Sequence, residues 1–471
     1  MKKIILFACA FIALHKGFSQ NELTFPLMEN VLQSSYINPA HVPEHKVSIG
    51  LPGISSLYLG ATNTGFTFNE ITSKIEGGRR ININDIPGLL KKENYLFTAL
   101  NTDLFSIRVK VRHFFWSFNI TEKFTSRISY PKDLMTLAIN GNQSFIGNEI
   151  SFANAGMNVS HFREYGLGIV KQHKKLVYGV RLKYLQGLSD IYFKTKDLSL
   201  KTATEQENYA LEVSSDATVF TSGLPTGDEG DGFVRSYMTN TKNPGMGIDL
   251  GFTYKLSRKI IVSGAINNIG FIAWRDKIRN YNVKGGSKFK GADLGRELLQ
   301  NKDSADAWED TGEKYLDSLE NSFKYTENAE KYTTSLIPQL YLTGKYMFSH
   351  KTHLALTFYL EKYIAFRPAL SLALYQEVGR WLNVVGSYSL QYGQFNNIGL
   401  GVVIKPPAIP LQFYLCGDQL INKYTTPENN FIPMPLDSKA FNIRLGMNIV
   451  FGSVKLHDKQ PYPHKKINIF E

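Results

Sequence analysis

Residues 441–451 read FNIRLGMNIVF. Successive side chains of a β-strand point to opposite faces, so this stretch has one apolar face and one polar face. The apolar face consists of Phe441, Ile443, Leu445, Met447, Ile449 and Phe451, and the polar face contains Asn442, Arg444, Gly446 and Asn448. Such a ribbon needs apolar surroundings on one side and polar surroundings on the other.

The same alternation recurs along the chain, as expected for barrel strands of about ten residues. It is clearest in 104–112, 176–185, 245–256, 353–361, 369–375, 382–391, 397–405 and 411–418. A soluble β-sandwich also alternates, but it does not account together for the aromatic content of 13%, the export signal and this many amphipathic strands. We therefore predict an all-β fold, a closed antiparallel transmembrane β-barrel.

The N-terminus, MKKIILFACAFIALHKGFSQ, has two lysines, an apolar run and small residues before Gln20. This order is typical of a secretory signal peptide, which we assign to residues 1–19. No later apolar run reaches the roughly 18 residues of a spanning helix. The sequence thus predicts the bacterial outer membrane, with outer-membrane lipids around the protein and the barrel-assembly machinery as a partner during insertion.

Loop lengths provide a second indication of a barrel. Short connections, such as 256–259 and 405–410, alternate with long ones at 218–243, 275–333 and 419–438. Outer-membrane barrels place short turns in the periplasm and long loops outside. We therefore expect a barrel over 46–452, a tail at 453–471 and both termini in the periplasm. Direct counting gives 14 to 18 strands, and the boundary at Arg112–His113 is open between a turn and one long bulged strand.

Charged residues gather on the polar faces of the predicted strands. The tentative lumen-facing charges are Arg108, Lys110, Arg112, Arg181, Lys183, Asp249, Lys255, Glu361 and Arg444. A positive lumen favours anions, whereas the alternative is that these charges pair with one another, with water or with a plug. The apolar row from Phe441 to Phe451 has the aromatic end typical of the barrel-insertion signal.

The sequence offers little support for catalytic, metal-binding or cofactor-binding sites. We predict no catalytic, metal or cofactor-binding residues and no enzyme, because no Ser/His/Asp arrangement stands out and Pro43 separates His41 from His45. The long loop 275–333 carries an acidic cluster among apolar residues, which predicts short solvated helices. Cys416, the cysteine left after removal of Cys9, fits as a small filler of the wall. No basic run belongs to a nucleic-acid motif.

Several segments carry a family resemblance: YINPAHVP (36–43), SYPKDLMTLAINGN (129–142), REYGLGIV (163–170), YGVRLKYLQGLSD (178–190), GIDLGFTYKL (247–256) and INNIGFIAW (266–274). They resemble an uncharacterised outer-membrane barrel family of Bacteroidota, a domain-of-unknown-function group related to FadL-type and PorV-type barrels. The resemblance implies 14 strands and a lumen plug formed by the N-terminal segment, residues 20–45.

Two functional hypotheses follow. The first is a non-enzymatic subunit or scaffold of an outer-membrane assembly for secretion, insertion or uptake, which presents its long loops to outer-membrane or periplasmic protein partners. The alternative is a FadL-like channel for small hydrophobic or anionic solutes. A barrel hydrolase or acyltransferase would require Ser, His and Asp side chains that converge on one rim.

Overall fold

The computed structural model describes residues 22–76, 78–205, 210–225, 232–289, 325–363, 366–391, 394–420, 424–425 and 434–453. The predicted signal peptide, the acidic cluster of the long loop and the tail from residue 454 onward lie outside these residues.

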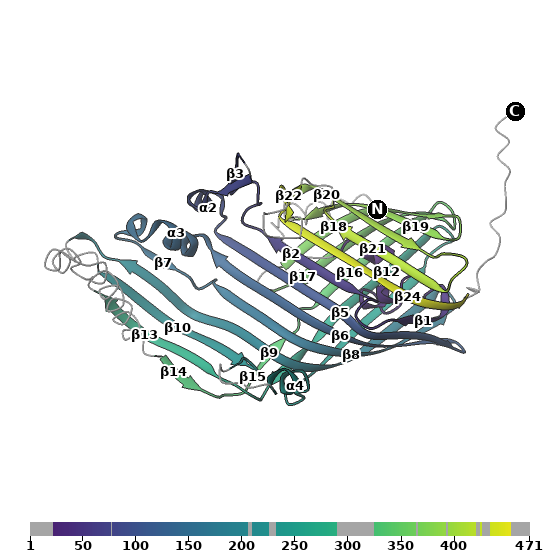
Figure 1. Cartoon of the computed structure of the whole chain (residues 1–471), viewed down its shortest axis with the longest axis horizontal. Coiled ribbons are helices and arrows are strands. Elements are labelled where there is room, and N and C mark those ends of the chain that lie inside the picture. The colour runs from purple at the N-terminus through teal and green to yellow at the C-terminus, as the bar shows by residue number, and fades with distance from the viewer. Residues whose placement is uncertain are drawn as a thin grey trace.

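Fourteen antiparallel strand positions form a closed barrel (Figure 1). The first position is shared by β1 (His45–Gly50) and β2 (Leu57–Asn63), which both pair with β5 (Glu93–Val111) and with the last strand, β24 (Ala440–Ser453). This double pairing closes the sheet. The other wall strands are β6 (Phe114–Pro131), β8 (Gly156–His173), β9 (Leu176–Thr202), β11 (Pro244–Lys255), β12 (Ile260–Trp274), β16 (Gln339–Met347), β17 (Thr352–Lys362), β18 (Phe366–Val378), β19 (Leu382–Gln391), β20 (Gln394–Ile404) and β21 (Leu411–Asp418).

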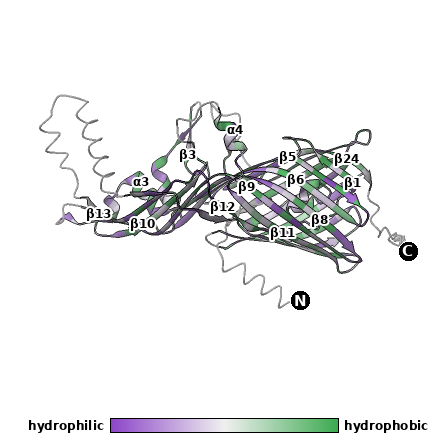
Figure 2. Cartoon of the chain, turned by 90° about the horizontal axis from the view of Figure 1, so that it is seen from below, coloured by the Kyte–Doolittle hydropathy of each residue, from purple (hydrophilic) through white to green (hydrophobic). Residues whose placement is uncertain are grey.

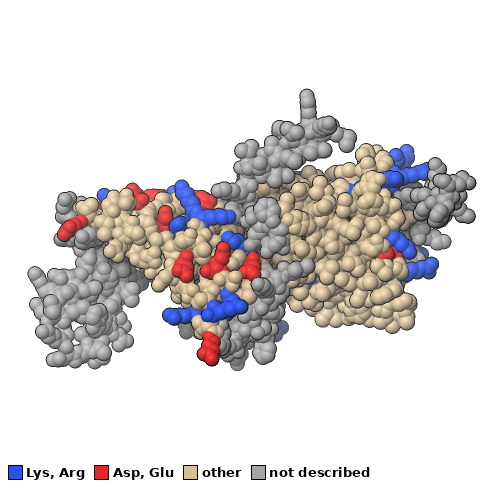
Figure 3. All heavy atoms as spheres, turned by 90° about the horizontal axis from the view of Figure 1, so that it is seen from above, with Lys and Arg blue, Asp and Glu red and all other residues tan. Residues whose placement is uncertain are grey.

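Strand β24 contains the stretch 441–451, and its two faces meet different surroundings. The side chains of Asn442, Arg444 and Asn448 are buried, whereas Leu445 and Phe451 are 41% and 47% exposed. On the face of the barrel seen in Figure 3, uncharged residues form a broad belt, and Lys and Arg gather at one end. An apolar belt outside and polar side chains inside are the pattern of a lipid-facing barrel wall.

Short turns join strands at one end of the barrel, which we call the turn end. They span 112–113, 174–175, 256–259, 348–351, 379–381 and 405–410. At the first turn the chain reverses directly, because Val111 pairs with Phe114 and Arg112 adopts a φ of 55°. The alternative of one long bulged strand at Arg112–His113 is therefore wrong, and the irregularity of β5 lies instead between Asp103 and Phe105.

The opposite end, the loop end, carries a sheet that projects beyond the barrel (Figure 1). Strand β9 runs for 27 residues, and its outer part pairs with β7 (Glu149–Ser151) and β10 (Leu211–Ser222). Strand β10 pairs in turn with β13 (Asn280–Phe289), and β13 pairs with β14 (Tyr325–Asn328). We call these strands the outer sheet. Strands such as β10 and β13 lie outside the wall, so the wall has the 14 strands that the resemblance implies, at the lower end of the counted range of 14 to 18.

Small elements complete the loop end. They are β3 (Thr72–Ile75), β4 (Gly78–Ile81), η3 (Ile83–Asp85), α2 (Ile86–Leu89), α3 (Lys132–Asn140), η4 (Gln143–Phe145), α4 (Phe233–Met238), β15 (Tyr332–Ser335), β22 (Tyr424–Thr425) and β23 (Met434–Pro435). Leu134 and Leu137 of α3 pack on Leu200 of the outer sheet. Hydrophilic residues are prominent on the outer sheet in Figure 2. None of the described helices is long and apolar enough to cross a membrane.

Candidate functional site

Residues 22–44, which we call the inner segment, lie inside the barrel. They form two short 3-10 helices, η1 (Phe25–Leu27) and η2 (Leu32–Tyr36), and nearly all of their side chains are buried. One apolar core joins Leu23, Phe25, Leu27, Met28, Val31 and Ile37 of the inner segment to Tyr341, Ala355, Tyr359, Ala369, Ala373, Tyr375, Val385, Val403, Tyr414 and Cys416 of β16–β21. Each fully buried Leu or Phe side chain contributes about 1.5–3 kcal/mol. The inner segment is thus packed against one half of the wall.

A turn at Asn38-Pro39-Ala40 fits into a hollow in the other half of the wall. The Asn38 Oδ1 atom accepts a hydrogen bond from the Ala40 amide at 2.9 Å, which fixes the turn. A Cβ atom at Gly179 of β9 would lie 2.4 Å from the Pro39 carbonyl oxygen, and one at Gly251 of β11 would lie 2.1 Å from Asn38 Oδ1. The two glycines therefore allow the turn to approach the wall closely.

Ion pairs also anchor the inner segment to the wall. The Arg444 guanidinium donates two hydrogen bonds to the Glu22 carboxylate, one of them at 2.9 Å. Lys345 forms an ion pair with Glu29, and Lys405 lies 2.5 Å from Glu44. Charge-assisted bonds of this kind are stronger than neutral ones, so the contacts link the segment to several strands.

The predicted lumen-facing charges differ in their surroundings. Six of these side chains are buried on the inner face of the wall: Arg108, Arg181, Lys183, Asp249, Glu361 and Arg444. Lys110 and Lys255 are partly exposed, and Arg112 is exposed in the β5–β6 turn. Arg108 donates a hydrogen bond to the His41 carbonyl of the inner segment. The apolar row predicted as an insertion signal lies on the outer face of β24.

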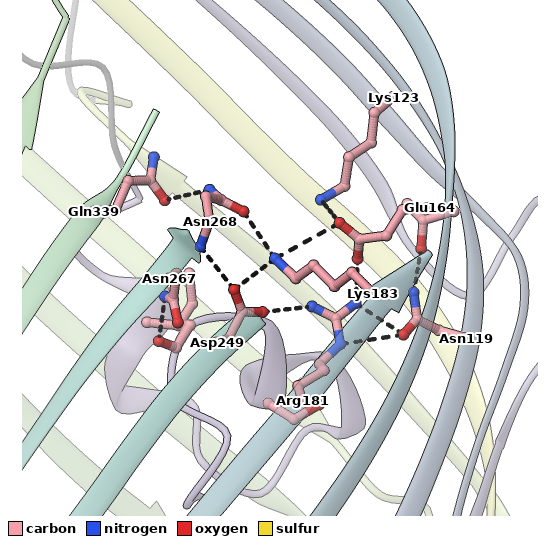
Figure 4. A network of polar contacts seen from close by, with 12 residues as sticks. Asn119, Lys123, Glu164, Arg181, Lys183, Asp249, Asn267, Asn268 and Gln339 are labelled. Atoms are coloured by element: carbon pink, nitrogen blue, oxygen red, sulfur yellow. Dashed lines mark hydrogen bonds and ion pairs between the residues drawn. The ribbon is translucent and has the colours of Figure 1, made fainter. Parts of the chain in front are cut away.

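A buried network on β6–β12 brings several of these charges together (Figure 4). Arg181 forms ion pairs with Glu164 and, at 3.0 Å, with Asp249. Lys183 lies 2.6 Å from Asp249, and Lys123 lies 2.6 Å from Glu164. Two carboxylates are thus shared by three cations in one network. These inward charges therefore pair with one another, which is the alternative to a lumen of unpaired positive charges.

Sequence reasoning missed Glu164 and Lys123, although the alternation of β8 contains a signal for Glu164. In residues 163–170, REYGLGIV, Glu164 lies on the face opposite Leu167 and Ile169. The network continues past the Lys183 ammonium, which donates to Asn268 Oδ1 at 2.8 Å. Asn268 adopts a φ of 62° at a register shift of β12, and its backbone amide donates to Asp249. No sequence pattern predicts this bulge.

A cavity of about 190 Å³ lies between the inner segment and the β5–β12 side of the wall. Its lining cations are Lys123, Arg127, Arg181, Lys183 and Arg444, and its carboxylates are Glu22, Glu164 and Glu361. Uncharged polar groups come from Thr121, Thr125, Asn101, Asn158 and Ser160. Apolar surface comes from Phe97, Phe162, Ile272 and Leu336. The lining thus combines polar and apolar groups, and its cations outnumber its carboxylates.

Two titratable groups of the inner segment meet at the β16 side. The His41 Nε2 atom lies 3.2 Å from Glu29 Oε1. Burial lowers the pKa of His41 to about 4, although the Glu29 carboxylate acts in the opposite direction. Burial is the largest single effect and would raise the pKa of Glu29, but the charge and hydrogen bond of Lys345 together with His41 and His353 outweigh it and lower that pKa to about 2. His41 is therefore neutral and Glu29 is ionised near neutral pH.

Among the described residues, no group of three or more His, Cys, Asp or Glu side chains is placed to hold a metal ion.

The closed barrel with its apolar outer belt defines the class, an outer-membrane β-barrel protein. Over residues 39–418 the chain matches a family of unknown function (DUF5723), and it belongs to that family. No curated protein matches the chain in sequence.

Solved structures similar to the chain include other barrels. A deletion mutant of the TodX monoaromatic hydrocarbon channel is 11% identical, with a TM-score of 0.44 over 88% of this chain and 93% of that one. A Pseudomonas aeruginosa FadL homologue is 10% identical, with a TM-score of 0.43 over 93% of this chain and 100% of that one. The translocator domain of the autotransporter NalP from Neisseria meningitidis is 10% identical, with a TM-score of 0.31 over 90% and 95%. These likenesses carry no functional assignment.

Proposed function

We propose that this protein is a non-enzymatic scaffold of an outer-membrane assembly, with a barrel plugged by its own N-terminal segment. The observation that carries the proposal is the anchoring of the inner segment. It shares an apolar core with β16–β21 and forms ion pairs with β16, with the turn after β20 and with β24 through Lys345, Lys405 and Arg444. A lumen filled in this way supports a closed barrel that serves as a membrane anchor.

In this proposal the turn end and both termini face the periplasm, and the loop end lies outside the cell. The outer sheet then stands beyond the membrane, where β7, β9, β10, β13 and β14 present a surface to protein partners. Their backbone pairing holds the surface rigidly on the barrel, because β9 runs without interruption from the wall into the outer sheet. A rigid platform suits a partner that must be held at a fixed place.

Two measurements test the scaffold. The full-length protein in planar bilayers should show no steady conductance, and native purification in mild detergent should recover it with at least one other outer-membrane or periplasmic protein. Truncation of the β9–β10 hairpin outside the wall should abolish recovery of the partner and leave barrel folding intact. Purification of the native protein as a monomer without a partner would contradict the proposal.

A second candidate function is uptake of a small polar or anionic solute. The cavity on the β5–β12 side of the inner segment favours it, because cations outnumber carboxylates in its lining. In liposomes, removal of residues 22–44 should then turn slow, solute-selective uptake into unselective flux. Equal permeability with and without the inner segment would contradict uptake through a gated lumen.

A further inference from the structure

The cations around the cavity are not equivalent. Lys123, Arg181, Lys183 and Arg444 all have carboxylate partners in the network or in the inner segment. Arg127 also lines the cavity, but among the described residues it has no carboxylate partner. One unneutralised guanidinium therefore faces an internal space that is partly shielded from solvent. Such a charge attracts an anion more strongly than an exposed one does.

The neighbours of Arg127 can supplement a bound anion. On β6, Lys123, Thr125 and Arg127 point to the same face, and adjacent members of this row are about 7 Å apart along the strand. Across the ladder Arg127 pairs with Asn158, and Thr125 pairs with Ser160. Each of these residues lines the cavity. The Ser160 hydroxyl already donates to the Asp190 carboxylate. A guanidinium, an ammonium, an amide and the Thr125 hydroxyl thus surround one part of the space, which matches the hydrogen-bond needs of an oxyanion.

Two further features point to an organic anion. Phe97 pairs with Arg127 on the opposite side, and Phe162 pairs with Lys123, so apolar surface flanks the cations. Asn101, across from Lys123, has a side-chain oxygen that is buried without a hydrogen-bond partner. A ligand with a donor group of its own would satisfy that oxygen.

We propose that Arg127 and Lys123 bind the oxyanion of a small organic solute, a carboxylate or a phosphate ester, in this cavity. The volume of about 190 Å³ is below the roughly 300–1,000 Å³ of a drug-sized pocket, so the ligand is compact. The polar rows of β6 and β8 exclude a purely hydrocarbon ligand, because such a ligand would remove their water without replacing the hydrogen bonds. The site goes beyond the scaffold function and is independent of transport.

Calorimetric titration of the full-length protein in detergent tests the site with defined probes. We use succinate and inorganic phosphate as the anions and succinamide as the neutral control. At least one anion should bind, and succinamide should not. Arg127→Gln should weaken that binding about tenfold or more, since a charge-assisted bond is lost. Arg127→Lys should retain part of the affinity, and the preferred anion identifies a carboxylate or a phosphate site.

A matched control removes the same charge elsewhere. Arg112→Gln, in the exposed turn at the opposite end of the barrel, should leave the affinity within about twofold, which is below the effect of one hydrogen bond. Folding of each variant is checked by circular dichroism and by its heat-dependent gel mobility. The proposal is overturned if Arg127→Gln binds as tightly as the native protein, or if neither anion binds at about 10 mM, the range of very weak affinity.

Discussion

The two halves of the barrel wall hold the inner segment in different ways. The half formed by β16–β21 has strands of 8 to 13 residues and meets the segment through an apolar core. The half that contains β5, β6, β8 and β9 has strands of 18 to 27 residues there, and its inner face carries most of the charge network and lines the cavity. Apolar packing favours tight filling, whereas the polar half keeps space for water or a ligand. The apolar half of the wall thus anchors the inner segment, and the polar half leaves room for a ligand.

The largest effect is expected on the polar half. Glu164→Gln keeps the shape of the side chain but removes one of the two carboxylates shared by Arg181, Lys183 and Lys123. Breaking a buried pair costs roughly 3–5 kcal/mol, because the remaining cations stay buried. Urea unfolding in lipid vesicles measures the loss. Glu212→Gln, which removes a partly exposed partner of Lys201, should cost about 0–1 kcal/mol. Equal losses would contradict a network role.

On the apolar half, Phe25→Ala should loosen the inner segment while the barrel stays folded. Phe25 is fully buried, and its ring centroid lies 6.1 Å from that of Tyr414. Truncation of a buried Phe costs about 3 kcal/mol, at the low end of the range because a short segment can partly relax. Hydrogen exchange should show faster exchange in residues 22–36 and unchanged exchange in β5–β9. Unchanged exchange in the inner segment would show that the core does not anchor it.

A smaller effect is expected where the turn at Asn38-Pro39-Ala40 meets the wall. Gly179→Ala places a Cβ atom 2.4 Å from a backbone carbonyl, and the forced shift should cost about 1–3 kcal/mol. Gly344→Ala is the matched control, since a Cβ atom there has nothing within 4 Å. Exchange at residues 37–41 should rise in the first variant and stay unchanged in the second. A rise in both would indicate a general effect of alanine in the wall.

The smallest effect is a pH dependence of the same segment. The pKa of His41 is lowered to about 4 in the folded protein. The unfolded chain therefore binds a proton at a higher pH than the folded one does, and His41 destabilises the folded state as the pH drops from about 6.5 toward 4. The pKa of Glu29 is lowered to about 2, so its contribution falls below about pH 4.5. Exchange of the inner segment should therefore rise on acidification, and His41→Gln should flatten the change above pH 4.5. An unchanged pH profile in that variant would assign the effect elsewhere.

The sequence by itself determined the wall. Alternation in stretches such as 441–451 and 176–185 located the strands and their two faces, because the two-residue period of a strand is a local property. It also located the short turns after β11 and β20. The strand number needed the register, since β1 and β2 share one position and β10 and β13 leave the wall. These are pairings between distant segments, which no local pattern contains.

The interior was decided by the tertiary structure. The sequence contains Asn38-Pro39-Ala40, Gly179 and Gly251 as separate motif residues, and only the closed barrel places the turn against both glycines. In the same way, Glu164 joins Arg181 and Asp249 because β8, β9 and β11 are neighbours in the sheet. Among the cations that line the cavity, Arg127 differs from Lys123, Arg181, Lys183 and Arg444 in having no carboxylate partner among the described residues. Sequence alternation assigns a charge to a face, but the distance to its partner depends on strand register and on the inner segment.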